Sequence, residues 1–341
     1  HLHVHMEDQQ QSKWQNMILK ENLQENRDKK GEDMNKPKVI VICGPTASGK
    51  TALSIELAKK INGEIISSDS MQIYKDMDIG TAKPTKDEQD GINHYLLDFI
   101  EPDKRYSVAD YKRDAEAAIN NILEHKKVPI IVGGTGLYVD SLIYNIQYPN
   151  IEFDDEYRKK LELIVQNEGL EKLYKEAEKV DKKAIEKISC NDKKRILRIL
   201  EIYHATGKNK TELEIESRSQ EVKYDYNVFA LNMDRNKLYE RINKRVDLMI
   251  ERGLIQEVEN LLKKYSEFPT AMQGLGYKEV VEYLNGNYTK EEMIEKIKQE
   301  SRRYAKRQLT WFRKNSQTIW LDGLEKLETN VNIIIEKTFG K

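Results

Sequence analysis

The residues best suited to chemistry form a glycine-bearing loop at 44–51 with the sequence GPTASGKT. The loop matches the pattern GxxxxGK(S/T), in which backbone N–H groups cradle phosphates. A lysine at this position places a positive charge on a terminal phosphate, and the hydroxyl after it binds Mg²⁺. We therefore expect a phosphate site with a magnesium ion bound at Thr51. Its residues are Gly44, Pro45, Thr46, Ala47, Ser48, Gly49, Lys50 and Thr51.

A second reactive group is the carboxylate of Asp69, which ends a short apolar run that begins at Glu64. Ligands of open α/β sheets bind at the carboxyl ends of the strands, so we expect Asp69 to lie on the phosphate-loop side of the sheet. There it could be an outer ligand of the metal, or a general base for a substrate nucleophile. Asp is also a common cap or turn residue, and this simpler role stays open.

The loop alone does not identify its ligand, which could be ATP, GTP or another diphosphate. A GTPase would need a guanine-reading Asn-Lys-x-Asp segment after a strand. Residues 209–212 (NKTE) end in Glu and follow no expected strand. ATPases often hold Mg²⁺ with an Asp at a strand end, but the third expected strand ends in Gly133 and Gly134.

Four short runs rich in β-branched residues predict strands at 38–43, 64–69, 128–132 and 226–231. Helical periodicity at 51–60 and 107–125 places helices between them. This alternation predicts an α/β fold with a P-loop NTPase-like parallel sheet flanked by helices.

Two regions depart from the alternation. Residues 146–222 are rich in Lys and Glu, have apolar residues at helical spacing, and predict a helical insertion domain. The chain from 236 onward is expected to be mostly helical. The catalytic core is then predicted to comprise 34–145 and 223–341, and the polar residues 1–33 are expected to form a disordered extension.

The composition excludes several classes of protein. A length of 341 residues suggests two domains, and no apolar run approaches the roughly 18 residues of a membrane span. Two cysteines, Cys43 and Cys190, exclude a disulfide scaffold. The N-terminal residues lack the apolar stretch of a signal peptide, so a cytoplasmic setting is expected. With 57 basic and 58 acidic residues, only local clustering can indicate an anionic partner.

Segments spread over roughly 38–322 together resemble the tRNA dimethylallyltransferase (IPP transferase) family. In chain order they are 44–51, 68–74 (SDSMQIY), 77–84 (MDIGTAKP), 133–138 (GGTGLY), 192–198 (DKKRILR), 271–279 (AMQGLGYKE) and 303–312 (RYAKRQLTWF). A phosphate loop occurs in many enzymes, whereas the whole series in this order is specific.

The resemblance implies transfer of a dimethylallyl group from its diphosphate to N6 of adenosine 37, in tRNAs that read codons beginning with U. The phosphate loop would then hold the donor's pyrophosphate rather than ATP. Asp69 would accept the N6 proton, and Lys50, Thr51, Thr135 and Arg235 would complete the catalytic set. The resemblance also places Arg235 and Arg241 near the diphosphate, where the guanidinium fork suits phosphate oxygens. On a helix rich in charge, however, an arginine could instead lie on a solvated face or pair with a carboxylate.

The resemblance also implies contacts to a tRNA anticodon stem-loop. They involve Asp69, Ser70, Met71, Gln72, Thr135, Lys194, Arg195, Ile196, Leu197 and Arg198. Separately, eight basic residues and one acid lie between 296 and 314. Such a stripe, with Arg302, Arg303 and Lys306, suits RNA phosphates, although a solvated helix face would look alike.

Two other classes of protein share parts of this pattern. A small-molecule kinase would use the same loop and Asp69, but it has no use for a long basic stripe. A nucleotide-gated binding module is disfavoured by the missing guanine segment. His94 is interpreted as a structural residue, because no second ligand or nucleophile is spaced to it. We expect an enzyme that acts as a monomer, without a membrane.

Overall fold

The computed structural model describes residues 36–148, 151–152, 154–218 and 220–340. The extension predicted at 1–33 lies outside the described residues. Within them, six parallel strands form one sheet in the order β3-β2-β4-β1-β5-β6. The strands are β1 (Lys38–Cys43), β2 (Gly63–Ser67), β3 (His94–Tyr95), β4 (Val128–Gly133), β5 (Asp225–Asn232) and β6 (Ile319–Asp322).

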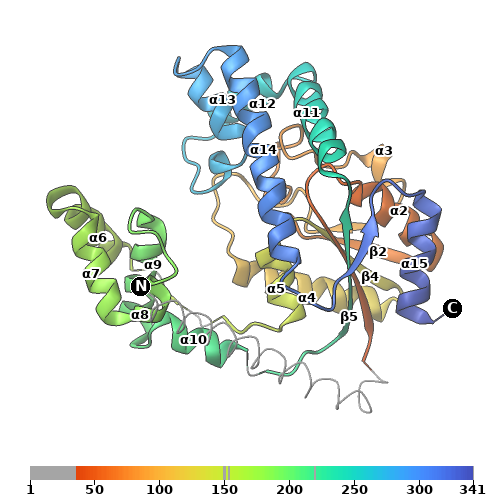
Figure 1. The fold of residues 1–341 in the computed structure, drawn as a ribbon, viewed down its shortest axis with the longest axis horizontal. Coiled ribbons are helices and arrows are strands. Elements are labelled where there is room, and N and C mark those ends of the chain that lie inside the picture. The colour runs from red at the N-terminus through yellow and green to blue at the C-terminus, as the bar shows by residue number, and fades with distance from the viewer. Residues whose placement is uncertain (1–35, 149–150, 153, 219, 341) are drawn as a thin grey trace, which may run out of the picture.

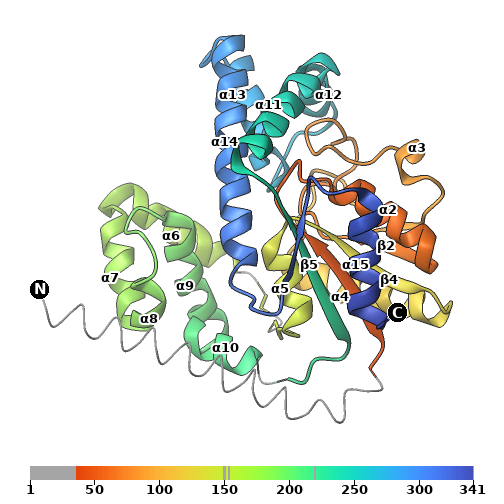
Figure 2. The ribbon, with the colours of Figure 1, turned by 45° about the vertical axis from the view of Figure 1, so that its right-hand side comes forward.

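Helices cover both faces of this sheet, as Figures 1 and 2 show. Side chains of β1 and β4 alternate between two apolar clusters, as expected for strands buried on both faces. One cluster includes residues of α4 (Val108–Glu124) and α5 (Gly136–Ile143). The other includes residues of α2 (Lys50–Ile61) and α15 (Leu327–Phe339). The predicted parallel sheet flanked by helices is therefore confirmed.

Two strands depart from the sequence prediction. β3 has only two residues, too few to show a hydrophobic pattern. β6 lies in the region expected to be mostly helical, and that expectation is corrected here. It is a four-residue edge strand, of which only Leu321 is buried, so its apolar signal is weak.

The described residues of the region predicted as an insertion form five helices, which lie to one side of the sheet (Figure 1). They are α6 (Asp155–Glu168), α7 (Leu170–Val180), α8 (Lys182–Ile185), α9 (Lys193–Thr206) and α10 (Lys210–Ser217). Asp154, Asp181, Asp192 and Asn209 cap the N-termini of four of these helices with side-chain hydrogen bonds. Leu161, Leu173 and Leu197 belong to an apolar core within this region.

The C-terminal helices stand above the carboxyl edge of the sheet (Figure 2). They comprise α11 (Arg235–Glu251), α12 (Leu254–Lys264), the short η3 (Ala271–Gln273), α13 (Tyr277–Leu284) and α14 (Lys290–Phe312). Ile73, Tyr74 and Met77, from the segment between β2 and the short helix α3 (Lys86–Gln89), are buried in their core. Across the described part of the chain, no helix combines the length and apolarity needed to cross a membrane.

Candidate active site

Three loops meet at the carboxyl edge of the sheet because β2, β4 and β1 are neighbours there. β1 leads into the phosphate loop, β4 into Gly134 and Thr135, and β2 into Asp69. The loops approach closely: a Cβ on Gly133 would lie 2.2 Å from the Ser68 carbonyl oxygen. Glycine is thus needed where the ends of β2 and β4 converge.

The phosphate loop has the shape that its sequence predicts. Gly49 adopts a left-handed conformation, with φ of 97°, immediately before α2. The first N–H groups of α2 have no partner within the helix, so they can bind an anion. Lys50 Nζ donates to the carbonyl oxygens of Gly44 (3.0 Å) and Pro45 (2.8 Å). The hydroxyl of Ser48 is buried without a hydrogen-bond partner among the described residues.

Two cations face this loop. Burial and, to a smaller extent, the nearby Arg245 guanidinium lower the pKa of Lys50 to about 8, although the Asp69 carboxylate acts in the opposite direction. Arg245 Nη1 donates to the Thr46 hydroxyl at 3.3 Å, and burial lowers its own pKa. Two partly desolvated cations of this kind suit a multiply charged anion.

Asp69 lies half-buried beyond β2. Its Oδ1 accepts the backbone N–H groups of Met71 (2.8 Å) and Gln72 (3.1 Å), so the turn role left open by the sequence is real. Both bonds use Oδ1 only. The turn therefore fixes the carboxylate without occupying Oδ2, which could accept a proton from a substrate.

Thr135 connects the loop after β4 to the Asp69 segment. Its hydroxyl accepts the Ser70 N–H at 3.0 Å, and its own N–H donates to the Ser68 carbonyl at 3.1 Å. Tyr304 of α14 hydrogen-bonds to Thr135 and Gln308, while burial raises its pKa to about 12. The predicted residues Asp69 and Thr135 thus lie on converging loops of one edge, and Lys50 and Thr51 lie in the first turn of α2 at the same edge.

The predicted arginines are placed differently. Arg235 is exposed in the first turn of α11, and Arg241 is exposed further along it. The contact to the phosphate loop is made instead by Arg245, one turn beyond Arg241, which donates to the Thr46 hydroxyl. Arg245 was not among the predicted residues, although its spacing of four from Arg241 places both on the same side of the helix.

The predicted tRNA contacts of α9 divide into two groups. Lys194 and Arg195 are exposed in its first turn. Ile196 and Leu197 are fully buried in the core of the insertion, so the prediction that they contact tRNA is corrected for their side chains. Burial lowers the pKa of Arg198, which is half-buried.

Helix α14 uses part of its basic stripe within the protein. Lys298 pairs with Asp247 (2.8 Å), and Arg302 donates to Asn243 (2.7 Å), both on α11. Arg302, one of the residues predicted to contact RNA, is thus half-buried and engaged within the protein. Arg303 is 57% exposed and pairs with Glu300, and Lys306 is exposed.

The surroundings of His94 fit the structural role predicted for it. Its Nδ1 lies 2.8 Å from the Ile92 carbonyl oxygen, and burial lowers the pKa of its imidazole. The described residues contain no cluster of three or more His, Cys, Asp or Glu that could hold a metal. A Mg²⁺ ion here would need oxygen ligands from Thr51 together with phosphate and water, which Mg²⁺ accepts. The exposed Thr51 in the first turn of α2 fits this.

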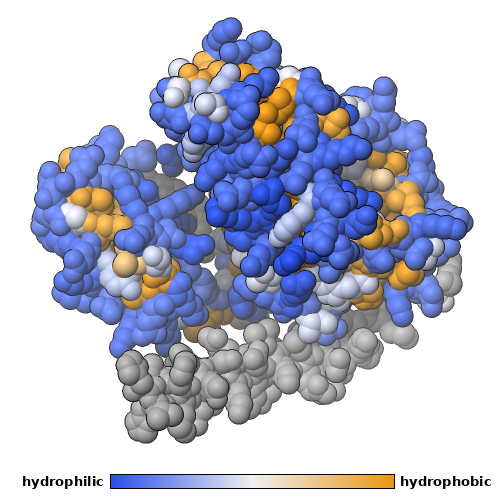
Figure 3. All heavy atoms as spheres, turned by 45° about the horizontal axis from the view of Figure 1, so that its top comes forward, coloured by the Kyte–Doolittle hydropathy of each residue, from blue (hydrophilic) through white to orange (hydrophobic). Residues whose placement is uncertain are grey.

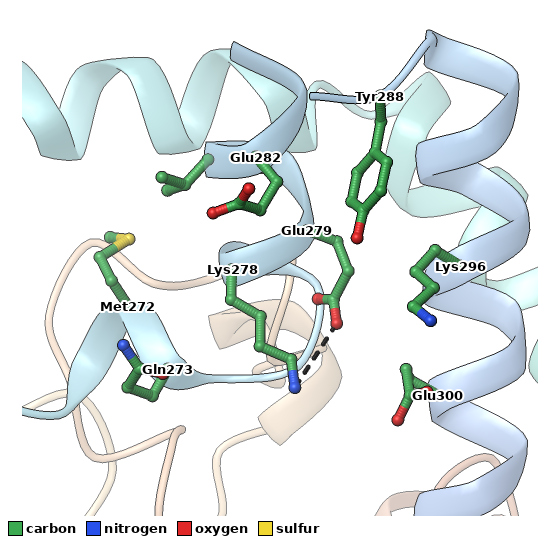
Figure 4. A pocket seen from close by; sticks show the side chains of 9 residues that line it. Met272, Gln273, Lys278, Glu279, Glu282, Tyr288, Lys296 and Glu300 are labelled. Atoms are coloured by element: carbon green, nitrogen blue, oxygen red, sulfur yellow. Dashed lines mark ion pairs between the residues drawn. The ribbon is translucent and has the colours of Figure 1, made fainter. Parts of the chain in front are cut away.

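A cavity of about 500 Å³ lies away from these loops, between η3, α13 and α14 (Figure 4). Lys278 and Glu279 pair on its wall at 3.7 Å, and Lys296 and Glu300 line it from α14. Figure 3 shows that this face of the molecule is largely hydrophilic. It also shows a groove that separates the insertion helices, on the left, from the rest of the molecule.

The fold and the edge loops define an α/β protein with a P-loop NTPase-like sheet and additional helices between α5 and β5. A model of the IPP transferase family matches residues 72–315. The chain is 50% identical to a tRNA dimethylallyltransferase of Acetivibrio thermocellus over 308 residues, which cover 89% of this chain and 98% of that protein. A second, from Bacillus cytotoxicus, is 47% identical over 291 residues, covering 85% of this chain and 92% of that protein.

Solved structures agree with this. A tRNA isopentenylpyrophosphate transferase from Bacillus halodurans superposes with a TM-score of 0.67 at 42% identity, covering 89% of this chain and 96% of that one. A eukaryotic dimethylallyltransferase acting on tRNA superposes with a TM-score of 0.71 at 32% identity. The match covers 89% of this chain and 77% of that one. The chain belongs to the IPP transferase family.

Proposed function

We propose that this protein transfers a dimethylallyl group from dimethylallyl diphosphate to N6 of adenosine 37 in tRNAs that read codons beginning with U. The products are N6-isopentenyladenosine and pyrophosphate. The observation that carries the proposal is the placement of a phosphate loop, Asp69 and Thr135 on neighbouring strands of one edge. A donor anion and an acceptor base can therefore be held side by side.

On the donor side, Lys50 and Arg245 bind the diphosphate from two directions. Both are already close to the phosphate loop. As the bond between C1 of the prenyl group and its oxygen breaks, negative charge grows on the leaving pyrophosphate, and these cations stabilise it. Thr51 would hold a Mg²⁺ ion, which supplies further positive charge to the phosphate oxygens when bound.

On the acceptor side, N6 of the adenosine forms the new bond to C1 and loses a proton. Asp69 accepts that proton, through the oxygen that its turn leaves unused. Thr135 holds the start of the Asp69 segment by its bond to Ser70 N–H. Its role is thus to position the base relative to the donor.

On the RNA side, a target base in a tRNA loop can leave its stack and enter a site of this kind. Arg303 and Lys306 on α14, with Lys194 and Arg195 on α9, present exposed cations to backbone phosphates. The proposal takes the enzyme to act as a monomer, with one chain supplying all of these residues.

Label transfer tests the proposal. The protein is incubated with Mg²⁺, dimethylallyl diphosphate labelled in its carbon chain, and an unmodified tRNA with adenosine 37 in an A-A-A stretch. We expect label on N6 of that adenosine after digestion. Absence of label, with phosphate transfer from ATP instead, would identify a kinase and overturn the proposal.

A further inference from the structure

The side chain of Gln308 occupies an unexpected position between the two loops of the donor site. It comes from α14, and it is buried, with 5% exposure. Its Oε1 accepts the Thr46 N–H at 2.9 Å, and its Nε2 donates to the Gly134 carbonyl at 3.0 Å. A Cβ on Gly134 would lie 2.2 Å from Gln308 Nε2, so the fit is close.

This contact removes a donor from the phosphate loop. Such loops bind anions through successive backbone N–H groups. Pro45 has no N–H, and the Thr46 N–H is taken by Gln308. The Ser48 N–H points back to the Pro45 carbonyl at 3.3 Å. Apart from the Ala47 N–H, the donors left for an anion lie toward the start of α2, around Gly49, Lys50 and Thr51.

A short anion and a long one differ in what they need from such a loop. A diphosphate can use the N–H groups at the helix start together with Lys50. A triphosphate carries more charge and must find further donors along the loop. At Thr46 it meets the neutral, buried Gln308 amide instead of a free N–H group. The cation near Thr46 is Arg245, and it can pair with a diphosphate as well as with a triphosphate.

We propose that Gln308 restricts the phosphate loop to diphosphate ligands, and so determines the selection of a prenyl diphosphate over a nucleoside triphosphate. This inference rests on the proposed function in taking the natural donor to be a diphosphate ester. Gln308 does so by occupying the Thr46 N–H, a role that needs no direct contact with the reacting atoms.

Inorganic anions test this without any transfer reaction. Titration calorimetry with Mg²⁺ gives the dissociation constants of pyrophosphate and tripolyphosphate for the wild type and for Gln308→Ala. We expect the wild type to prefer pyrophosphate. In Gln308→Ala, tripolyphosphate binding should tighten about tenfold while pyrophosphate binding stays within about twofold. Gln299→Ala removes an exposed Gln of the same helix and should change neither constant.

A second variant guards against loss of folding in Gln308→Ala. Gly134→Ala keeps the glutamine but pushes its amide away, so it should shift the same ratio in the same direction. Equal binding of both anions by the wild type, or an unchanged ratio in both folded variants, would overturn the inference. If the variants changed the ratio of the two dissociation constants but the protein transferred no label to tRNA, the role of Gln308 in anion selection would stand. The proposed function would then be rejected.

Discussion

At the residue scale, Asp69 holds a turn and is also the proposed general base, and a single substitution can separate these two roles. Asn keeps an oxygen to accept the N–H groups of Met71 and Gln72 but cannot take a proton. We therefore expect Asp69→Asn to lower the rate of single-turnover transfer by about 10²–10⁴ while donor binding is kept. Asp69→Ala should also lower thermal stability, because it loses the turn. Transfer at the wild-type rate in Asp69→Asn would show that this carboxylate is not the base.

The charge of Lys50 gives a pH prediction. Burial, with Arg245 close by, lowers its pKa to about 8, so the charged form is lost as pH rises through that value. An anion needs the charged form, so binding of dimethylallyl diphosphate should weaken from about pH 7 to about pH 9. Lys50→Arg keeps its charge over this range and should flatten the dependence. Calorimetry at several pH values measures the dissociation constant of dimethylallyl diphosphate. A wild-type constant that does not change with pH would contradict the assignment of Lys50 as the titrating cation.

The sequence predicted the residues of the site that lie within local motifs, and missed those that do not. The loop at 44–51 and the placement of Asp69 follow from spacing and strand ends. Arg245 and Gln308 reach the loop from helices about 200 and 260 positions further along the chain. Such contacts depend on how helices pack, which no local pattern encodes.

At the element scale, only part of the basic stripe of α14 is free to contact RNA as proposed. Lys298 and Arg302 bind α11, whereas Arg303 and Lys306 face solvent. Replacing Arg303 and Lys306 by Gln should reduce the slope of log affinity for tRNA against log salt by about 2. Lys337→Gln on α15 is the control and should leave the slope unchanged. A filter-binding series over salt concentration measures it, and an unchanged slope in the double variant would remove this face from the interface.

Helix α9 makes a different prediction, since Leu197 is a core residue of the insertion. Leu197→Ala should lower the free energy of unfolding by about 2–5 kcal/mol, because it leaves a cavity. Chemical denaturation measures this change. Wild-type stability together with selectively weaker tRNA binding would instead restore Leu197 as a direct contact.

The elements themselves were predictable where they were long or buried. The apolar runs of β1, β2, β4 and β5 and the amphipathic helices showed their periods in the sequence. β6 showed no such period. It is a four-residue edge strand with Trp320 and Asp322 exposed, so its hydrophobic pattern is too short to indicate a strand.

At the scale of the whole molecule, Glu257 joins the C-terminal helices to the segment after Asp69. Its carboxylate accepts the N–H groups of Asp78, Ile79 and Gly80, and the Tyr277 hydroxyl at 2.5 Å. Glu257→Ala should raise hydrogen exchange at 78–80, since three amides lose their acceptor. As a control, Lys264→Ala removes an exposed ion pair to Asp76 that joins the same two regions. This variant should leave hydrogen exchange at 78–80 unchanged. Equal exchange in both variants would show that Glu257 does not hold this segment.

The overall arrangement was only partly predictable. Parallel strands implied that functional loops share an edge. The order that sets β4 between β1 and β2 was not implied, and this order brings Thr135 between Lys50 and Asp69. Pairing between strands far apart in sequence is fixed by packing of both faces.

The two chain segments that enter and leave the insertion run together where they join the core. Asn145 donates to the Glu221 carbonyl at 2.6 Å, and the Gln147 N–H donates to the Ser217 carbonyl at 3.0 Å. The ends of the inserted region are thus held as one paired stem, so changes in its length add only a small closure cost. A region joined in this way is interchangeable: evolution or a protein engineer can lengthen, trim or replace it to suit another RNA while the sheet and its catalytic edge keep their geometry.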